Sequence, residues 1–273
     1  MIPEHEGNKT MRLVDVTEKT ENIFFRCLHD EEPEDFQQTS IRRQWYKRNK
    51  SNGHRAKLLI LDNGQIGGLC QYIPIEHSHL IGEDLLALLC MWVHGYEHGV
   101  GNQQSKGYGR FILNSIEEDA RLSGLKGVAA WGMDWEINWM PLSFFDHMGY
   151  THVDREDKVV VVWKPFYADA KPPELLRLES SPLKGTDKVN VTVAVNGWCG
   201  CYKLLCAREA VKGLEDIVEY REVDTPDRTT ILHLGKVGGV FLDGEVFQPY
   251  QLCTSDALRA EIIRLYKQKG GEQ

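Results

Sequence analysis

Short apolar runs alternate with amphipathic stretches over the N-terminal part of the chain. Asp84–Val93 is almost continuously apolar, which predicts a buried strand. Gly107–Ser123 carries apolar residues at helical spacing, which predicts an amphipathic helix. Two strand-like runs flank Asn63-Gly64, a pair that supplies the positive φ values of a two-residue hairpin turn. Because Gly127–Trp131 and Val159–Trp163 are further runs of strand length, the pattern predicts a mixed α/β fold.

A proline-containing stretch with few apolar residues, Tyr167–Asp187, interrupts this alternation and is interpreted as a linker. It divides the chain into a first domain over residues 11–166 and a smaller second domain over residues 188–273. The second domain starts with Val189–Asn196, which alternates as a strand does, and ends with a helical segment, Ser255–Lys267. Further helices are expected at Phe36–Lys47 and Thr225–Leu234. An α/β architecture is therefore expected in both domains.

Composition and charge argue against several classes of function. Of the 273 residues, 42% are apolar and 26% are charged, which is typical of a globular protein. The net charge of −8 disfavours a non-specific nucleic-acid binder, and no apolar run approaches the roughly 18 residues of a membrane span. Met1–Thr10 does not resemble a signal peptide, and seven scattered cysteines do not suggest a disulfide framework. We therefore expect a cytoplasmic protein without membrane or nucleic-acid partners, and its oligomeric state is open.

The clearest chemical signal is the segment Gln104–Gly109 (QSKGYG), between the expected strand and the expected helix. Glycine lets the backbone approach a phosphate without a Cβ clash, and the helix offers free N–H groups and the positive end of its dipole. The spacing is neither Gly-x-Gly-x-x-Gly nor a Walker loop, which disfavours dinucleotides and nucleoside triphosphates. The same pattern also occurs where a strand simply turns tightly into a helix, so both interpretations stand.

Two motifs of the first domain resemble those of a known family. Gln104, Gly107 and Gly109 match the fixed positions of the acetyl-CoA loop Arg/Gln-x-x-Gly-x-Gly/Ala, and Phe144–Tyr150 (FFDHMGY) is similar to an aromatic segment further along. On these motifs, residues 11–166 resemble the GCN5-related N-acetyltransferases (GNAT). The resemblance implies the GNAT fold, acetyl-CoA as co-substrate, and direct acetyl transfer to a primary amine. It leaves the amine unidentified and implies no metal.

Longer segments are similar to one branch of this family, the YoaP-like proteins, which carry a small second domain. These segments are QYIPIE (Gln71–Glu76), MWVHGYEHGVGNQQSKGYG (Met91–Gly109), AAWG (Ala129–Gly132) and WKPF (Trp163–Phe166). The resemblance implies a thioredoxin-like fold for residues 188–273. The residues NGWC (Asn196–Cys199) would then lie where its first strand turns into a helix.

The resemblance also implies which residues hold acetyl-CoA. Backbone N–H groups would bind the pyrophosphate along the loop formed by Gln104, Ser105, Lys106, Gly107, Tyr108 and Gly109. Backbone groups at the end of the preceding strand would bind the pantetheine arm and polarise the thioester carbonyl, and these belong to Met91, Trp92 and Val93. Trp131 would flank the gap through which the arm enters.

Amide formation needs a base for the amine and an acid for the leaving thiolate. Many family members have a tyrosine at the position of Phe145, whose ring cannot donate a proton. We therefore expect Glu97 first, and then His94 and Tyr96, to carry the proton transfers, because these residues follow the end of the strand. The alternatives are that the thiolate leaves unassisted, or that these three are ordinary solvated loop residues.

Three cysteines of the second domain, Cys199, Cys201 and Cys206, are clustered in sequence. Cys199-Gly200-Cys201 is one residue short of the thioredoxin Cys-x-x-Cys, and Gly238 takes the place of the cis-proline, so ordinary disulfide exchange is not expected. Three interpretations stay open. The domain is a thioredoxin fold that has lost its redox chemistry and serves packing or substrate docking, or it holds a redox site that pairs Cys199 with Cys201 or Cys206, or the three cysteines form a soft-metal or metalloid site. Cys199 is expected to be the most reactive, because it would lie at a helix N-terminus.

The function expected from the sequence is therefore an acetyl-CoA-dependent N-acetyltransferase with a thioredoxin-like C-terminal domain. The alternative comes from another class of protein. In it, the first domain binds CoA without turnover, and the cysteines sense redox state or bind a soft metal. Phe145 is the residue that favours this alternative.

Overall fold

A computed structural model describes residues 11–27, 36–135, 139–177, 187–199, 202–224, 229, 238–247 and 253–270. Contacts divide the chain into two compact units. The first comprises Met1–Asp35, Lys50–Glu76 and Gly82–Glu174, and the second comprises Phe36–Asn49, His77–Ile81 and Leu175–Gln273. Within the described residues, no helix is long and apolar enough to cross a membrane.

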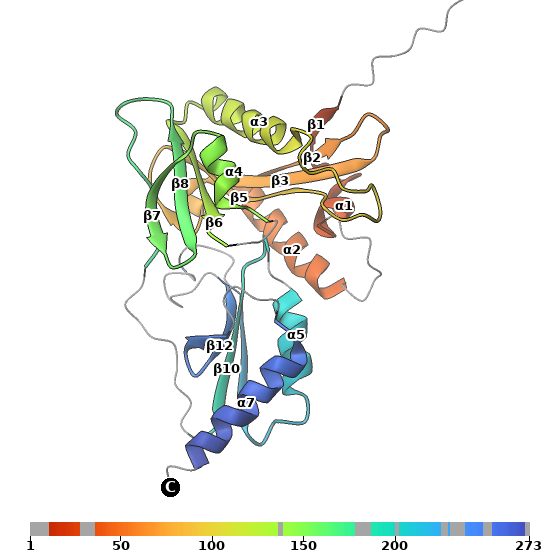
Figure 1. The fold of residues 1–273 in the computed structure, drawn as a ribbon, viewed down its shortest axis with the longest axis vertical. Coiled ribbons are helices and arrows are strands. Elements are labelled where there is room, and N and C mark those ends of the chain that lie inside the picture. The colour runs from red at the N-terminus through yellow and green to blue at the C-terminus, as the bar shows by residue number, and fades with distance from the viewer. Residues whose placement is uncertain are drawn as a thin grey trace, which may run out of the picture. The chain divides into compact units, whose positions relative to one another are not determined.

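The first unit is built on a seven-stranded sheet in the order β1-β2-β3-β5-β6-β8-β7 (Figure 1). Its strands are β1 (Arg12–Asp15), β2 (Arg55–Ile60), β3 (Ile66–Pro74), β5 (Leu85–Val93), β6 (Gly127–Met133), β7 (Thr151–Glu156) and β8 (Val159–Pro165). Only the β5–β6 pair among these strands is parallel. Its helices are α1 (Glu21–Phe25), α3 (Tyr108–Leu122) and α4 (Leu142–His147), with short 3-10 turns at Lys50–Asn52 and Ile75–His77. The expected mixed α/β class is confirmed.

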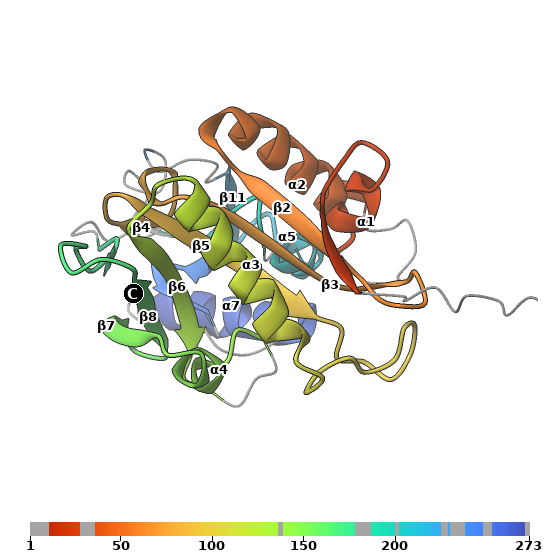
Figure 2. The same ribbon diagram turned by 90° about the horizontal axis from the view of Figure 1, so that it is seen from above.

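The long helix α3 crosses one face of this sheet (Figure 2). It buries Ile112, Ile116 and Ala120 of the apolar stripe that its spacing predicted, and Leu113 beside them, while Phe111 is only partly buried. These side chains join a core with residues of β5, β6 and α4, including the fully buried Phe145. Burial of each large aliphatic side chain contributes roughly 1.5–3 kcal/mol to folding, so the stripe fixes which side of α3 faces the sheet.

Asp119 ties the C-terminal end of α3 to strands β2 and β3. Its carboxylate accepts a bond from the Lys57 ammonium at 2.6 Å and from the Tyr72 hydroxyl, and Arg55 lies 3.1 Å away. Burial opposes ionisation of Asp119, but the bonds from Lys57 and Tyr72 outweigh it and hold its pKa below the ordinary value. The carboxylate is therefore ionised at neutral pH and holds the helix through charged hydrogen bonds.

Glu117 ties α3 to strand β8, near the edge of the sheet opposite to β2 and β3. Its buried carboxylate lies 3.0 Å from the ammonium of Lys164 on β8 and accepts a bond from the Tyr150 hydroxyl at 3.3 Å. Burial, followed by the negative charge of Glu117, raises the pKa of Tyr150 well above its ordinary value. The hydroxyl therefore stays protonated and acts as a donor. Together, Glu117 and Asp119 fix the position of the helix along the sheet.

The second unit contains a four-stranded sheet in the order β11-β10-β12-β13. β10 pairs with β11 in parallel and with β12 antiparallel, and β12 pairs with β13 antiparallel. The elements are β10 (Val189–Val195), β11 (Val218–Asp224), β12 (Gly239–Leu242), β13 (Glu245–Val246), α2 (Phe36–Asn49), α5 (Tyr202–Val211) and α7 (Ser255–Gly270). β4 (Leu80–Ile81) and β9 (Glu174–Leu175) form a separate two-stranded sheet. The smaller core of this unit is made by valines of β10 with Leu204, Ala207 and Ala210 of α5 and Leu258 and Ile262 of α7.

Two sequence-based expectations differ from the structure, and a third falls almost entirely outside the described residues. The hairpin after β2 forms, but Asn63 is not in the left-handed region and Gly64 is, at φ 83°, so the loop has three residues instead of two. The side chain of Asn63 accepts the Gln65 N–H at 3.0 Å, which stabilises this wider turn. The helix expected at Phe36–Lys47 is α2, which packs in the second unit although it precedes most of the first in sequence. The helix expected at Thr225–Leu234 falls almost entirely outside the described residues.

We predict that Asp119→Asn destabilises the first unit by ~2 kcal/mol, because it removes the charged acceptor of Lys57 and Tyr72. Asp15→Asn is the matched control: Asp15 also binds Arg55 but its side chain is 60% exposed, so a change within about 0.5 kcal/mol is expected. Urea unfolding measures both. Since the folded-state pKa of Asp119 is lowered, its contribution is present above about pH 4 and is lost as the pH falls through the folded-state pKa. Equal losses in the two variants would contradict the role of the buried carboxylate.

Candidate functional site

The parallel strands β5 and β6 pair over only three positions, Leu85–Ala87 with Gly127–Ala129. Beyond these, β5 stays paired with β3 as far as Val93, and β6 stays paired with β8 as far as Met133. The facing edges of β5 and β6 therefore separate toward their C-terminal ends while each strand is held by its outer neighbour. Backbone N–H and C=O groups of β5 beyond Ala87 can therefore hydrogen-bond to a partner other than β6.

A bulge and a tryptophan mark the point of separation. Gln71 pairs with Cys90 and Tyr72 pairs with Leu88, so Leu89 is an extra residue on β5. The indole N–H of Trp131 on β6 donates to the Leu89 carbonyl at 3.0 Å. The half-buried indole therefore bridges the two strands where their backbones part.

The loop that leaves β5 is held by His94 and Gln103. The His94 backbone N–H donates to Gly67 at 3.0 Å, and its carbonyl accepts from the Gln103 backbone at 2.8 Å. The Nδ1 atom of His94 lies 3.0 Å from the Gly101 carbonyl, and a carbonyl can only accept, so Nδ1 carries a proton. The Gln103 side chain donates to the Val100 carbonyl at 2.6 Å. His94 is consequently a buried part of the loop framework.

The start of α3 is open and free of negative charge. Gly107 precedes the helix at φ 84°, and a Cβ added there would meet no described atom within 4 Å. The first turn of α3, all of which is described, carries no acidic residue. Gln104 reaches back to the Val93 carbonyl at 3.3 Å and packs so closely on Gly95 that a Cβ there would lie 2.5 Å from its amide nitrogen. The free N–H groups of the first turn suit an anion.

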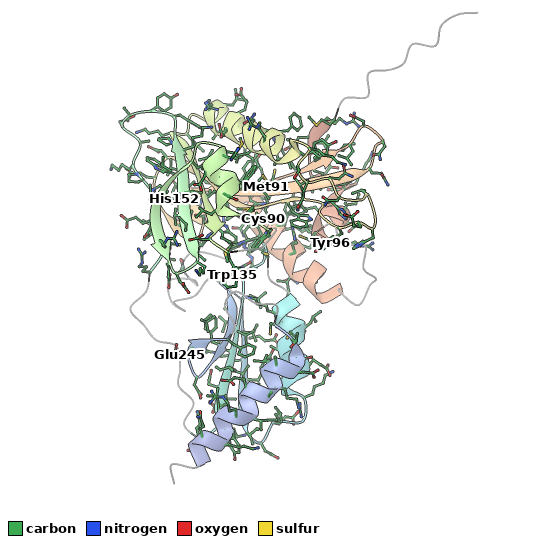
Figure 3. All side chains as sticks on the ribbon, in the orientation of Figure 1. Cys90, Met91, Tyr96, Trp135, His152 and Glu245 are labelled. Carbon is green, nitrogen blue, oxygen red and sulfur yellow. The ribbon has the colours of Figure 1, made fainter. Side chains whose placement is uncertain are left out.

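The remaining candidates of this region occupy different positions. Tyr96 and Glu97 are exposed on the loop, and the Tyr96 ring stacks on His98 with the ring centres 5.0 Å apart. Figure 3 shows Met91 on β5 and Tyr96 beyond the end of that strand. Ser105 and Lys106 are also exposed, and the Lys106 ammonium donates to the side chain of Gln103 at 3.2 Å. The structure thus places the candidates expected for binding and for catalysis on one strand end, one loop and one helix start.

Phe145 lies in the core instead of facing this region. It is fully buried on α4, with its ring 5.6 Å from that of Tyr150. Neighbouring Phe144 approaches the start of α3, since a Cβ added at Gly109 would lie 3.1 Å from its ring. The side chain at this position of α4 therefore offers no proton donor.

The second unit holds the cysteine candidates. The backbone N–H of Cys199 donates to the Asn196 side chain at 2.8 Å, and Cys201 lies outside the described residues. Cys206, on α5, has its Sγ atom 2.9 Å from that of Cys253, a residue that the sequence spacing gave no reason to select. Among the described residues, no group of three His, Cys, Asp or Glu side chains could hold a metal ion.

A buried aromatic cluster surrounds the turn before Cys199. Trp198 lies between Trp45 of α2, at 5.5 Å between ring centres, and His79, which stacks on it at 5.3 Å. Burial lowers the pKa of His79 to about 4, so this ring is neutral near pH 7. The close packing of Trp45 also explains why residue 197 is a glycine, because a Cβ at this position would lie 2.0 Å from the Trp45 side chain.

Comparison with known proteins finds no matching family model and no matching curated protein. Solved structures that resemble part of the chain include a GNAT-family acetyltransferase from Staphylococcus aureus, which is 11% identical and covers 58% of this chain and 100% of its own, with a TM-score of 0.42. They also include the N-acetyltransferase PseH of Campylobacter jejuni, at 16% identity, 57% and 99% coverage and a TM-score of 0.40. The PaiA N-acetyltransferase of Thermoplasma acidophilum, solved with coenzyme A, is 12% identical with 57% and 99% coverage and a TM-score of 0.41.

Proposed function

We propose that the first unit transfers an acetyl group from acetyl-CoA to a primary amine. The observation that carries the proposal is the separation of β5 from β6 beside the open start of α3. A long, flexible thioester with a pyrophosphate near one end suits this combination. The strand edge offers hydrogen bonds to an amide-containing arm, and the helix start offers N–H groups to phosphates.

The loop from Gln104 to Gly109 suits the pyrophosphate on three grounds. Gly107 leaves the approach open, the first turn of α3 has no acid, and the Lys106 ammonium lies on the same loop. The interactions of His94 and Gln103 fix this loop before any ligand binds, which limits the entropy lost on binding. In this proposal the backbone N–H groups of Gln104–Gly109 carry the phosphate contacts.

The free edge of β5 suits the pantetheine arm. Met91, Trp92 and Val93 lie beyond the last residue that pairs with β6, so their backbone groups can pair with the amides of an extended ligand. A backbone N–H of this edge would also polarise the carbonyl that is attacked, as an oxyanion hole does. The bridge from Trp131 to Leu89 would mark the inner limit of this binding edge.

When bound, acetyl-CoA supplies the activated acetyl group. The amine nitrogen attacks the thioester carbonyl carbon, the carbon–sulfur bond breaks, and the thiolate leaves with the bonding pair. We assign the proton of the attacking amine to Glu97, with His94 and Tyr96 as the other candidates, since all three follow the strand end. Among them, His94 has its Nδ1 atom engaged with Gly101, so only its Nε2 atom is suited to proton transfer.

We further propose that residues 188–273, within the second unit, form a thioredoxin-like domain of the YoaP-like type. The strand order β11-β10-β12-β13, with one parallel pair at its start and two antiparallel pairs after it, supports this proposal. So does the placement of α5 directly after β10 and of α7 after the last strand. A cytoplasmic location is part of the same proposal.

One observation favours the alternative, in which the first unit binds CoA without turnover. Phe145 is buried in the core, and its position on α4 therefore offers no acid for the leaving thiolate. In that case the loop and the strand edge would bind CoA just as tightly, but no amine would be acetylated. Binding and turnover must consequently be measured separately.

Binding is tested with Gly107→Asp and the matched variant Gly124→Asp. Both glycines have positive φ, of 84° and 73°, and an added Cβ meets no described atom at either, but they lie at opposite ends of α3. Gly107→Asp places a carboxylate at the proposed phosphate site, so we expect the acetyl-CoA Kd to rise at least about tenfold. Gly124→Asp should change it less than about twofold, and calorimetry measures both. Similar Kd values for the two variants would place acetyl-CoA elsewhere.

Turnover is tested by amide formation and thiol release from acetyl-CoA with a panel of primary amines. Glu97→Gln should lower kcat by about 10²-fold if Glu97 is the base. Glu118→Gln, which changes an exposed acid on the body of α3, should leave kcat unchanged. His94→Asn keeps a donor for Gly101 but removes Nε2, so a loss of kcat at unchanged acetyl-CoA affinity would assign the proton transfer to His94. Tight binding with no amide from any amine would support the binding protein instead.

A further inference from the structure

Cys206 and Cys253 come from separate helical segments of the second unit and lie in contact. Cys206 is on α5, Cys253 lies two residues before α7, and their Sγ atoms are 2.9 Å apart. A disulfide requires about 2.05 Å, whereas two thiolates on one tetrahedral zinc ion would be about 3.7 Å apart. Both side chains are only partly buried, so a small reagent can reach them. The observed separation lies between these two values, but among the described residues no third metal-ligating side chain joins the pair, so the contact suits a disulfide better than a shared metal ion.

The two thiols have different surroundings. Burial, followed by the hydrogen bond with Cys253, raises the pKa of Cys206 to about 12. Cys253 precedes Thr254, whose hydroxyl accepts the Ala257 N–H at 3.3 Å and whose carbonyl accepts the Leu258 N–H at 3.0 Å. Thr254 thus caps α7, and Cys253 lies just before the start of that helix. Because the Cys206 thiol stays protonated near neutral pH, we assign Cys253 as the attacking thiol and Cys206 as the resolving one.

We propose that Cys206 and Cys253 form a reversible redox pair that is oxidised by a low-molecular-weight disulfide, such as oxidised glutathione. The Cys253 thiolate attacks one sulfur of the reagent, forms a mixed disulfide and releases one thiolate. Cys206 then gives up its proton and attacks the Cys253 sulfur, which releases the second thiolate. One disulfide is reduced to two thiols while the two protein thiols become one disulfide, so atoms and electrons balance.

The bond would fasten the start of α7 to α5. Both helices pack on the sheet of this unit, and Leu204 and Ala207 of α5 join Leu258 and Ile262 of α7 in its core. The two cysteines are 47 residues apart in sequence, so a bond between them restricts a long loop of the unfolded chain. Oxidation should therefore stabilise the second unit.

The linkage is tested on the full-length protein with its native cysteines. The protein is incubated with oxidised glutathione, free thiols are blocked with N-ethylmaleimide, and the digest is mapped by mass spectrometry with and without reductant. We expect a reductant-sensitive peptide pair that joins Cys206 to Cys253. A Cys206 linked to Cys199 or Cys201 instead, or both thiols still blocked by the maleimide after the glutathione treatment, would overturn the proposal.

Three variants separate the roles of the two sulfurs. Cys206→Ser should retain glutathione on Cys253, because the resolving thiol is gone, whereas Cys253→Ser should react at Cys206 at least about tenfold more slowly. Cys199→Ser is the control and should form the Cys206–Cys253 bond as the wild type does. Oxidation should raise the Tm by about 5 °C in the wild type and in Cys199→Ser, and leave it unchanged in the other two. Equal reaction rates of the single thiols, or an unchanged wild-type Tm after complete linkage, would contradict the mechanism or its structural effect.

Discussion

The pairing between β5 and β6 ends after three residues, although each strand continues in the sheet beside its outer neighbour. This early end of the pairing determines which backbone groups of the first unit are available to a ligand. A strand edge inside a sheet is ordinarily satisfied by the next strand, but here the edge of β5 from Leu88 onward is directed to other partners. At the point of separation, Leu89 forms a bulge on β5, and the indole N–H of Trp131 on β6 donates to the Leu89 carbonyl.

The separation is useful only if α3 is held at a fixed position beside it. Two carboxylates in the C-terminal half of the helix achieve this: Asp119 binds Lys57 and Tyr72, and Glu117 binds Lys164 and Tyr150. Their negative charges lie well away from the first turn, which carries none. The helix is thereby anchored by its acids without reducing the positive potential at its start.

Much of this arrangement follows from local sequence, because it depends on local patterns. The apolar run Asp84–Val93 and the helical spacing after Gly107 placed β5 and α3 to within one or two residues. Strands β1 and β7 were not predicted, because they are edge strands with few buried positions and lack a strong apolar pattern. The three-residue loop at Asn63-Gly64 depends on a side-chain bond that the dipeptide alone does not specify.

Long-range partners were the main feature that the sequence could not supply. Nothing local indicates that α2 packs with the second unit, where Trp45 contacts Trp198. Nor does spacing reveal that Cys206 meets Cys253, since the pair is created by the packing of α5 against α7. The motif Gln104–Gly109 indicated a phosphate loop, but only the structure shows that His94 and Gln103 hold that loop in place.

The most direct test of the central claim is amide hydrogen exchange with and without saturating acetyl-CoA. If acetyl-CoA lies along β5 and at the start of α3, exchange should slow at least about tenfold in Gln104–Gly109 and at Met91–Val93. The amides of β12 in the second unit should serve as an unaffected reference. Unchanged exchange in both segments at saturating acetyl-CoA, or slowing confined to other parts of the chain, would contradict the account.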